Sequence, residues 1–164
     1  SLARRLAEEP QLGVLAPVVL DPSGKEEDSM RRLPTPWTLV RKLLGGREGN
    51  SYRREGDLLL PDWVAGVCML FPWEVYRRFG GFDEKFWLYY EDVDLCCRVR
   101  DGGLRVAVDP DIRITHDARR SSRRDPRMLR FHIVSAGRFF SSKVYWRCRR
   151  LARDRGVGSV AVRA

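Results

Sequence analysis

Residues 80–98 read GGFDEKFWLYYEDVDLCCR and gather carboxylates, aromatic rings and a glycine pair within one short stretch. The acidic side chains fall into two groups, Asp83 with Glu84 and then Glu91, Asp92 and Asp94. The second group lies where a helix is expected to begin, because residues 91–101 carry an apolar side and are followed by two glycines. A loop that places carboxylates beside aromatic rings predicts a site for a ligand rich in hydroxyl groups and favours a role in glycosyl transfer.

The acids of the second group have two interpretations that the residue types alone leave open. Acidic side chains in the first turn of a helix interact favourably with its dipole, at roughly 0.3–1 kcal/mol each. Asp94 can also pair with Arg98 four residues later. Alternatively, one carboxylate deprotonates an acceptor hydroxyl as that hydroxyl attacks the anomeric carbon of a nucleotide-linked sugar. A position at a helix start beside aromatic rings suits the tuning of such a pKa.

The aromatic side chains of the stretch also allow two roles. They can form a platform against the apolar face of a sugar, or they can pack in the core. The platform candidates are Phe86, Trp87, Tyr89 and Tyr90. We expect core packing for Phe82 and Phe86 at least.

Length and composition fit one globular domain with a core of its own. The chain has 164 residues, of which 43% are hydrophobic and 32% are charged. It holds no apolar run of about 18 residues that could span a bilayer, and its first residues indicate a charged helix fragment and no signal peptide. The cysteines lack CxxC spacing and paired histidine ligands, so we expect reduced, buried thiols in a cytosolic compartment and no zinc site.

Apolar runs and turn residues outline the other elements. Residues 11–20, QLGVLAPVVL, are bounded by Pro10 and by an Asp-Pro-Ser-Gly turn and predict a buried strand. Residues 62–71, DWVAGVCMLF, predict another, in which Gly66 indicates either a β-bulge or the close approach of a backbone or ligand. We further expect helices over 36–44 and 72–79, loops over 21–35 and 45–56, and strands over 104–108 and 112–115, joined by a turn at 109–111.

The last third of the chain is predicted to be one long helix from residue 126 to about residue 151. Its apolar side chains recur at helical spacing on one face. They are Leu129, Ile133, Ala136, Phe140 and Val144.

The basic excess of the chain lies in the same region. Residues 1–112 hold 16 basic and 19 acidic residues, whereas residues 113–164 hold 15 basic and 3 acidic residues. This asymmetry indicates an anionic surface or ligand. The helix either packs on the domain with a solvated basic side, or it attaches to an anionic membrane surface with the help of Tyr145 and Trp146.

The alternation of strands and helices predicts an α/β fold, a mixed sheet flanked by helices with a long basic helix at its C-terminal end. About four strands are expected, fewer than a nucleotide-binding sheet usually has, so sequence outside this chain is expected to complete the sheet. We divide the chain into residues 1–125 and a basic amphipathic helix and tail, residues 126–164.

Two segments match the three-residue DxD pattern with which many glycosyltransferases hold a divalent metal. They are Asp92-Val93-Asp94 and Asp109-Pro110-Asp111. The pattern is short and therefore unspecific. The first match opens a helix and the second lies in an expected turn, so neither is interpreted as the metal motif.

Three segments taken in order resemble the C-terminal half of family 2 glycosyltransferases, in particular the bacterial rhamnosyltransferase-like group. They are DWVAGVCMLF, GGFDEKFWLYYEDVDLCCRVRDGG and VAVDPDIRITH. The shared pattern is a strand with glycine, a helix, GGFDE, an aromatic stretch, ED-x-D-L-x-x-R and a strand that ends in histidine. It covers about residues 10–145, and QLGVLAPVVLDPSG and residues 31–35 match the weaker stretch that precedes it.

The resemblance implies a GT-A fold and inverting transfer from a nucleoside-diphosphate sugar, with dTDP-rhamnose as the donor of that group, to a cell-envelope glycan or a lipid-linked acceptor. It implies Mg²⁺ or Mn²⁺ as cofactor and a cytoplasmic enzyme at the inner face of the plasma membrane.

The resemblance also implies roles for single residues. Asp92 would be the catalytic base, with Glu91 beside it, and His116 would contact the metal or the diphosphate. The residues expected to line the substrate side or brace its loop are Asp62, Trp63, Gly66, Asp83, Trp87 and Tyr90.

The chain departs from the family pattern in ways that affect its expected activity. The nucleotide-binding strands and the DxD motif of the family's first half have no counterpart before residue 10, and Asp117-Ala118-Arg119-Arg120 replaces a small, glycine-containing segment. We therefore expect the acceptor-side half of an enzyme, which alone neither binds nucleotide-sugar tightly nor turns over.

The alternative function is a non-catalytic module that binds nucleic acid or a partner through the basic tail. The chain carries no signature of a common nucleic-acid-binding fold, and the acidic loop would repel phosphate.

Overall fold

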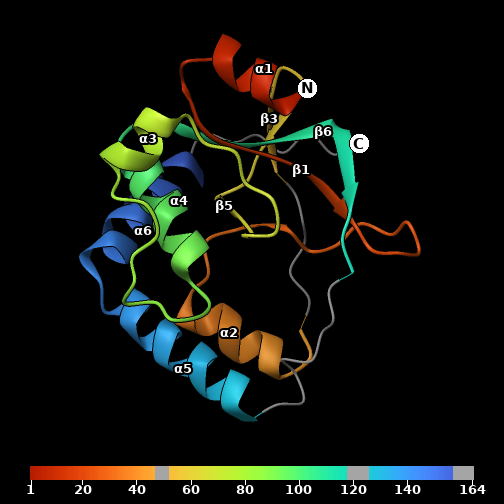
Figure 1. The fold of residues 1–164 in the computed structure, drawn as a ribbon. Coiled ribbons are helices and arrows are strands. Elements are labelled where there is room, and N and C mark those ends of the chain that lie inside the picture. Colours follow the sequence, from red (N-terminus) through yellow and green to blue (C-terminus); the bar gives the residue numbers. More distant parts are fainter. Residues whose placement is uncertain (47–51, 118–125, 157–164) are drawn as a thin grey trace.

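Two long parallel strands, β1 (Leu12–Leu20) and β6 (Arg105–Thr115), form the centre of the fold (Figure 1). The computed structural model describes residues 1–46, 52–117 and 126–156. The buried positions of β1 are almost continuous along the strand, as expected for a strand that is covered on both faces.

Shorter strands complete two sheets. β6 also pairs with β4 (Leu58–Leu60), which pairs with β3 (Arg53–Glu55), so the larger sheet has four strands in the order β1-β6-β4-β3. β2 (Met30–Arg31) and β5 (Trp63–Val64) form a separate antiparallel pair. The predicted α/β class, with a mixed sheet flanked by helices, is confirmed.

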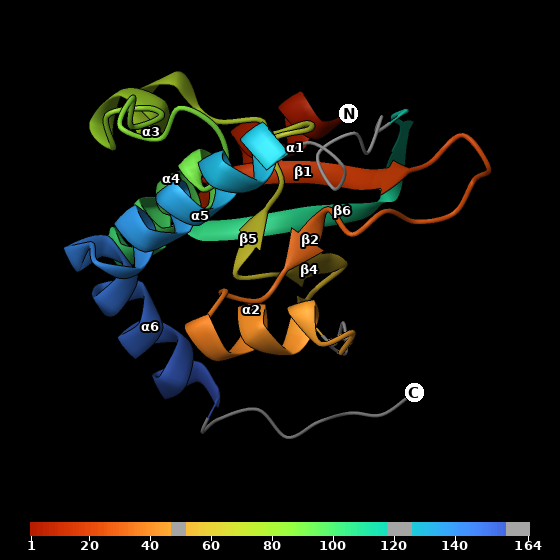
Figure 2. The same ribbon diagram turned by 90° about the horizontal axis from the view of Figure 1, so that it is seen from below.

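Helix α4 occupies the middle of the molecule, between the sheets and the C-terminal helices (Figure 2). It packs on β1, β5 and β6 and is covered by α6. The helices are α1 (Leu2–Glu8), α2 (Pro36–Leu43), α3 (Trp73–Arg78), α4 (Glu91–Asp101), α5 (Pro126–Phe140) and α6 (Lys143–Gly156). The predicted helices over 36–44, 72–79 and 91–101 are thereby confirmed, as is the buried strand over 11–20.

A glycine allows α4 to lie close to the sheet. A Cβ atom at Gly13 of β1 would lie only 2.4 Å from Cγ1 of Val99, which is fully buried on α4. The register of β1 against β6 also shifts at this position, between Leu12 and Val14. Any larger residue at this position would push the helix away from the strand.

The prediction of one long C-terminal helix is wrong, because the helix is interrupted at Ser141 and Ser142 and two helices, α5 and α6, form instead. The Ser142 hydroxyl accepts a hydrogen bond from the Tyr145 N–H at 3.1 Å and so caps the start of α6. A serine that satisfies the free N–H groups of a helix start favours a new helix over continuation of the old one.

Predictions of strands and loops are also corrected. Residues 105–115 form one strand, and Asp109-Pro110-Asp111 is part of a bulge at which β1 shifts from Asp109 to Arg113. The strand stays continuous because the residues before and after this bulge both pair with β1. The strand expected over 62–71 is reduced to β5 and an isolated bridge between Leu15 and Leu70. The expected loops over 21–35 and 45–56 contain β2 and β3, because their partners β5 and β4 lie elsewhere in the chain. The segment Ala118-Arg119-Arg120 lies outside the described residues.

Candidate functional site

The candidate site forms where the loop of residues 80–90 enters α4. Tyr89 and Tyr90 both adopt left-handed backbone conformations, with φ of 66° and 71°. Such conformations cost residues other than glycine on the order of 1–3 kcal/mol each and are concentrated at functional sites. The Ser135 hydroxyl of α5 donates to the Leu88 carbonyl at 2.7 Å and holds this part of the loop. The strained loop therefore sets the direction in which the acids of α4 are presented.

Asp92 lies in the first turn of α4, as predicted, and faces the backbone of Gly66. Its Oδ2 accepts a hydrogen bond from the Gly66 N–H at 3.0 Å, and its Oδ1 accepts one from the Val93 N–H at 2.8 Å. Burial raises the pKa of Asp92 above its usual range, although these N–H groups oppose the rise. A carboxylate that backbone donors orient and burial makes more basic has the properties of a general base.

Gly66 lies beyond the end of β5 and outside any ladder of the sheet. Its N–H donates to Oδ2 of Asp92 and orients that carboxylate. A Cβ atom at Gly66 would lie 3.8 Å from both Cβ and Oδ2 of Asp92, an ordinary van der Waals contact, so the available space does not require a glycine. Neither the bulge nor the close-approach interpretation is confirmed.

Glu91 lies beside Asp92 with one carboxylate oxygen unpaired. Its Oε2 is buried and has no hydrogen-bond partner among the described residues. Burial raises the pKa of Glu91, and the charge of Asp92 adds to the rise. Because buried polar atoms are nearly always hydrogen-bonded, this oxygen needs a donor that the described residues do not supply.

The aromatic stretch divides into buried and exposed rings. Tyr90 is buried among His132, Phe139 and Phe140 of α5, and burial raises its pKa to about 12. Trp87, in contrast, is 80% exposed. Among the predicted platform residues, Trp87 has a ring free to contact a ligand, while Tyr90 packs mainly against protein.

The two phenylalanines of the stretch have different outcomes. Phe86 is buried, so the expectation of core packing is confirmed for it. The same expectation is wrong for Phe82, which is exposed and makes an edge-to-face contact with the ring of Tyr76 of α3.

Asp62 and Trp63 make structural contacts behind the site. Asp62 Oδ1 lies 2.8 Å from the buried guanidinium of Arg100, and its Oδ2 accepts a hydrogen bond from the Leu33 N–H at 2.9 Å. The buried Trp63 donates its indole N–H to the Arg32 carbonyl at 2.8 Å. These bonds join β5, α4 and the segment before α2. Substrate contact by either side chain stays a prediction.

The glycine-rich loop is braced through Asp94 and Arg98. Arg98 pairs with the buried Asp94 at 2.7 Å and donates to the Gly81 carbonyl at 2.7 Å and to the Phe79 carbonyl. Burial raises the pKa of Asp94, against the opposing charge of Arg98. Asp83, predicted to brace the loop, accepts a bond from the Lys85 N–H at 3.0 Å and stabilises a turn within it.

Two residues at the site were not predicted from the sequence, Arg31 and His132. The Arg31 guanidinium lies 5.1 Å from the Trp63 ring centre, and its charge lowers the pKa of Asp92 in opposition to burial. The His132 ring lies 5.1 Å from the ring of Tyr89. Burial lowers the pKa of His132, and the charges of Lys42 and Arg31 add to this. Arg31 belongs to the segment 31–35 that matched the family pattern without a role of its own, and no local motif marks His132. Each residue reaches the site through the packing of its element, β2 for Arg31 and α5 for His132.

His116 lies apart from these residues. It follows the end of β6, which Figures 1 and 2 both place well away from α4. Its buried Nδ1 lies 3.8 Å from Oε2 of Glu27 and makes no hydrogen bond with a described residue. Its backbone N–H donates to the Leu20 carbonyl at 2.9 Å.

A divalent cation would find an incomplete set of ligands in this part of the chain. Within residues 1–46, 52–117 and 126–156, no group of three or more histidine, cysteine, aspartate or glutamate side chains is arranged to hold a metal ion. The pair His116 and Glu27 offers at most two donors, whereas Mg²⁺ requires an octahedral set. The described residues alone therefore do not form the implied Mg²⁺ or Mn²⁺ site.

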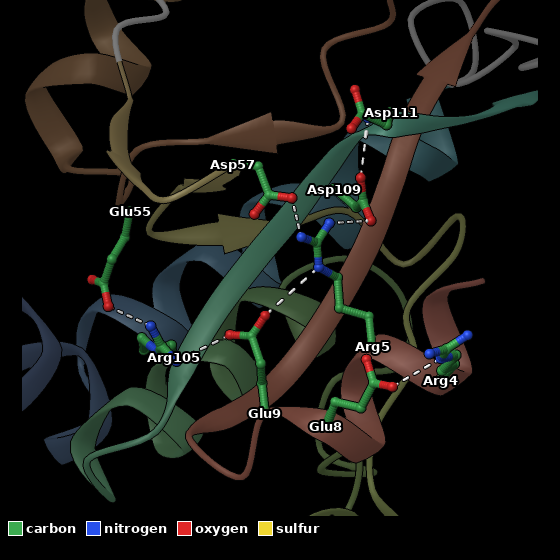
Figure 3. A network of polar contacts seen from close by, with 9 residues as sticks. All are labelled: Arg4, Arg5, Glu8, Glu9, Glu55, Asp57, Arg105, Asp109 and Asp111. Carbon is green, nitrogen blue, oxygen red and sulfur yellow. Dashed lines mark hydrogen bonds and ion pairs between the residues drawn. The ribbon is translucent and has the colours of Figure 1, made fainter.

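The second DxD match serves the fold (Figure 3). Oδ2 of the buried Asp109 lies 2.8 Å from the Arg5 guanidinium, and Arg5 also contacts Asp57 and Glu9. Oδ1 of Asp109 accepts the Asp111 N–H at 3.0 Å. The network ties α1 to β6 and to the turn between β3 and β4.

The α/β scaffold presents a carboxylate at a helix start that backbone N–H groups orient, an arrangement that suits group transfer with a carboxylate base. Curated proteins similar to this chain narrow the class. They are homologues named as rhamnosyltransferases or hexosyltransferases, so the chain is glycosyltransferase-like, and the resemblance noted in the sequence is confirmed.

Three of these relatives come from bacteria and an archaeon. N-acetylglucosaminyl-diphospho-decaprenol L-rhamnosyltransferase of Mycobacterium tuberculosis is 30% identical over 134 residues, which are 71% of this chain and 41% of that protein. Rhamnosyltransferase WbbL of Escherichia coli is 34% identical over 83 residues, 50% of this chain and 31% of WbbL. Low-salt glycan biosynthesis hexosyltransferase Agl10 of Haloferax volcanii is 29% identical over 96 residues, 57% of this chain and 29% of Agl10.

The similarity covers only part of this chain and part of each relative. The chain spans less than half the length of each of these relatives. No protein family model matches it. The homology therefore identifies the type of protein to which this portion is related, and it leaves donor, acceptor and metal to be proposed.

Proposed function

We propose that this chain is the acceptor-side part of an inverting glycosyltransferase that uses a nucleoside-diphosphate sugar and acts in the synthesis of cell-envelope polysaccharide. The proposed donor is dTDP-rhamnose, and the proposed acceptor is a glycan or a lipid-linked sugar. The names of the mycobacterial and Escherichia coli relatives support rhamnosyl transfer. The observation that carries the proposal is the carboxylate of Asp92, oriented by the Gly66 N–H and made more basic by burial.

In the proposed reaction, Asp92 accepts the proton of the acceptor hydroxyl. The hydroxyl oxygen forms a bond to the anomeric carbon while the bond from that carbon to the diphosphate oxygen breaks, which inverts the configuration. Glu91, with its unpaired Oε2, would orient the acceptor by accepting a hydrogen bond from a second hydroxyl. The exposed ring of Trp87 would cover the apolar face of a sugar.

A divalent cation, Mg²⁺ or Mn²⁺, belongs to the same proposal for the whole enzyme. When bound, such an ion would neutralise charge on the leaving diphosphate. This chain would contribute no more than the imidazole of His116 with Glu27 nearby, so the remaining donors would have to come from outside the described residues.

The test of the base assignment compares two acids on the same helix. This chain would replace the matching part of the mycobacterial relative, and rhamnosyl transfer by the chimera would be measured. Asp92→Asn is expected to abolish transfer while the circular dichroism spectrum is retained. Asp101→Asn, at the exposed other end of α4, is the control and should retain activity. Retained transfer in Asp92→Asn would defeat the assignment.

The chain by itself is expected to be inactive. Calorimetric titration with dTDP-rhamnose should show no tight binding, because the part of the relatives that this chain does not match is expected to hold the nucleotide. Micromolar donor binding by the isolated chain would contradict this expectation.

A further inference from the structure

Helix α2 presents an apolar stripe to the outside of the molecule. Trp37, Val40 and Leu44 follow one another at helical spacing, and all are exposed, Trp37 to 71% and Leu44 to 81%. Leu39 packs against the core from the opposite side of the helix. The amphipathic pattern that predicted this helix thus does not bury its main apolar stripe within the described residues.

Helix α5 exposes apolar side chains in the same way over its first half. Leu129, Ile133 and Val134 are exposed, Ile133 to 63%. A hollow of about 470 Å³ lies between this part of α5 and the exposed ring of Trp87. Its walls combine apolar and cationic groups, Trp87, Phe131 and Val134 with Arg127, Arg130 and Arg138.

The charge of both helices has a single sign. α2 has the sequence PWTLVRKL and α5 the sequence PRMLRFHIVSAGRFF, so neither holds an aspartate or a glutamate. A helix that faces water usually mixes charges of both signs on its exposed side. Exposed apolar side chains combined with arginine and lysine are instead typical of helices that lie in the interface of an anionic bilayer.

The exposed apolar side chains are concentrated at one end of the molecule. Of the 11 large exposed hydrophobic side chains among the described residues, 7 belong to α2, its C-cap, α5 or Trp87. Figure 1 shows α2 and α5 along the bottom of the fold, and Figure 2, which views that bottom face, shows α5 beside α4 and α2 beyond β5. In Figure 1, α4 begins at its end nearest to the bottom of the fold. Tyr90, the N-cap of α4, contacts His132 of α5, so Asp92 also lies toward this end.

Further strands of a longer enzyme have a different place to attach. β1 and β3 are the two outer strands of the four-stranded sheet, and β1, with nine residues against three in β3, offers added strands the longer edge. In Figure 2, α2 lies on the side of the sheet away from β1. An extension of the sheet at β1 would therefore leave α2 uncovered.

We propose that this end of the molecule, formed by α2, the first half of α5 and Trp87, rests on an anionic lipid bilayer. The exposed tryptophans and aliphatic side chains enter the interface, and Arg130 and Arg138 meet lipid phosphates. This inference deepens the proposed function and rests on it for its biological use, because a lipid-linked acceptor would reach Asp92 from the same side. The sequence placed the membrane contact on the C-terminal helix with Tyr145 and Trp146. Of these two residues of α6, Tyr145 is buried and Trp146 is exposed, and the proposal assigns the contact to α2 and the first half of α5.

The test measures co-sedimentation of the full chain with vesicles of phosphatidylcholine, with and without 30% phosphatidylglycerol, a composition on the order of that which attracts basic segments. Binding is expected only with the anionic lipid. Trp37→Ser and Ile133→Ser should each lower the partition coefficient about tenfold, from the loss of one buried apolar side chain. Trp73→Ser is the matched control, because Trp73 is 63% exposed on α3, away from this end.

Hydrogen exchange of the unmodified chain provides a second measurement that no folding defect can disturb. Vesicles should protect amides of α2 and α5 and leave those of α3 unchanged. Equal loss of binding in Trp73→Ser, or protection of α3 in place of α2, would overturn the proposal. The proposal would also be overturned if the chain did not bind vesicles but formed oligomers that Ile133→Ser dissociates, since a second copy would then cover this end.

The two proposals fail separately. Asp92→Asn should bind vesicles like the parent chain, so lost transfer with retained vesicle binding concerns the base alone. Transfer to a water-soluble acceptor with no vesicle binding would retain the proposed function and remove the membrane contact.

Discussion

Replacing Arg98 with methionine would test the brace that holds the glycine-rich loop against α4. Arg98 is the shared donor to three groups, the Asp94 carboxylate and the carbonyls of Gly81 and Phe79. Methionine keeps much of the apolar stem and removes the guanidinium. The carboxylate of Asp94, only 3% exposed, would then be buried without a partner.

The expected loss of stability follows from these contacts. Removing one partner of a buried ion pair typically costs about 3–5 kcal/mol. The Gly81 and Phe79 carbonyls each lose a bond worth about 1 kcal/mol, in part replaced by water. Because the three contacts share one side chain their losses are not additive, and we expect about 4 kcal/mol in all.

The loss should also depend on pH. Burial already raises the pKa of Asp94, and Arg98 opposes the rise, so the variant should raise it further. A group whose pKa is higher in the folded than in the unfolded state destabilises the fold as pH rises above the unfolded value. The destabilisation should therefore be largest at pH 7 and smaller at pH 4, where Asp94 accepts a proton.

Urea unfolding at both pH values would measure the effect, with Arg77→Met on the exposed surface of α3 as control. The double variant Arg98→Met with Asp94→Asn should recover part of the loss, because no unpaired carboxylate remains. A loss below about 1 kcal/mol at pH 7, or an equal loss at pH 4, would refute the argument that Asp94 depends on Arg98.

Three further changes have defined outcomes. Burial raises the pKa of Asp92, so its carboxylate costs stability above the unfolded pKa; Asp92→Asn should raise the melting temperature at pH 7, and the gain should vanish near pH 4. Gly13→Ala should cost about 1–3 kcal/mol in urea unfolding, because its Cβ would lie 2.4 Å from Val99, and Val99→Ala should relieve part of that cost. Ser142→Ala should cost about 0.5–2 kcal/mol and lower the helical circular dichroism signal of α6, because Tyr145 loses its cap.

Local patterns predicted most of the helices that position the candidate site. The acids followed by an apolar side and a glycine pair predicted α4 with its observed bounds, because capping and dipole effects act within one turn. Gly66 was marked as either a bulge or a place of close approach, and the structure shows instead that its N–H donates to Asp92.

Elements that depend on distant partners were predicted less well. The bulge in β6 looked like a turn because Asp-Pro-Asp favours turns locally, whereas pairing with β1 keeps the strand continuous. The apolar positions on either side of Ser142 keep helical spacing, so the sequence pattern did not indicate the interruption between α5 and α6. That interruption is stabilised by the hydrogen bond from the Tyr145 N–H to the Ser142 hydroxyl.

The sequence by itself determined the α/β class, the helix that carries Asp92 and the likeness to rhamnosyltransferases, because these depend on order and spacing along the chain. Only the tertiary structure decided what surrounds Asp92. The Gly66 N–H, the charge of Arg31 and the ring of His132 come from separate elements. Burial of a carboxylate, and hence its raised pKa, is a property of packing in three dimensions that no local pattern encodes.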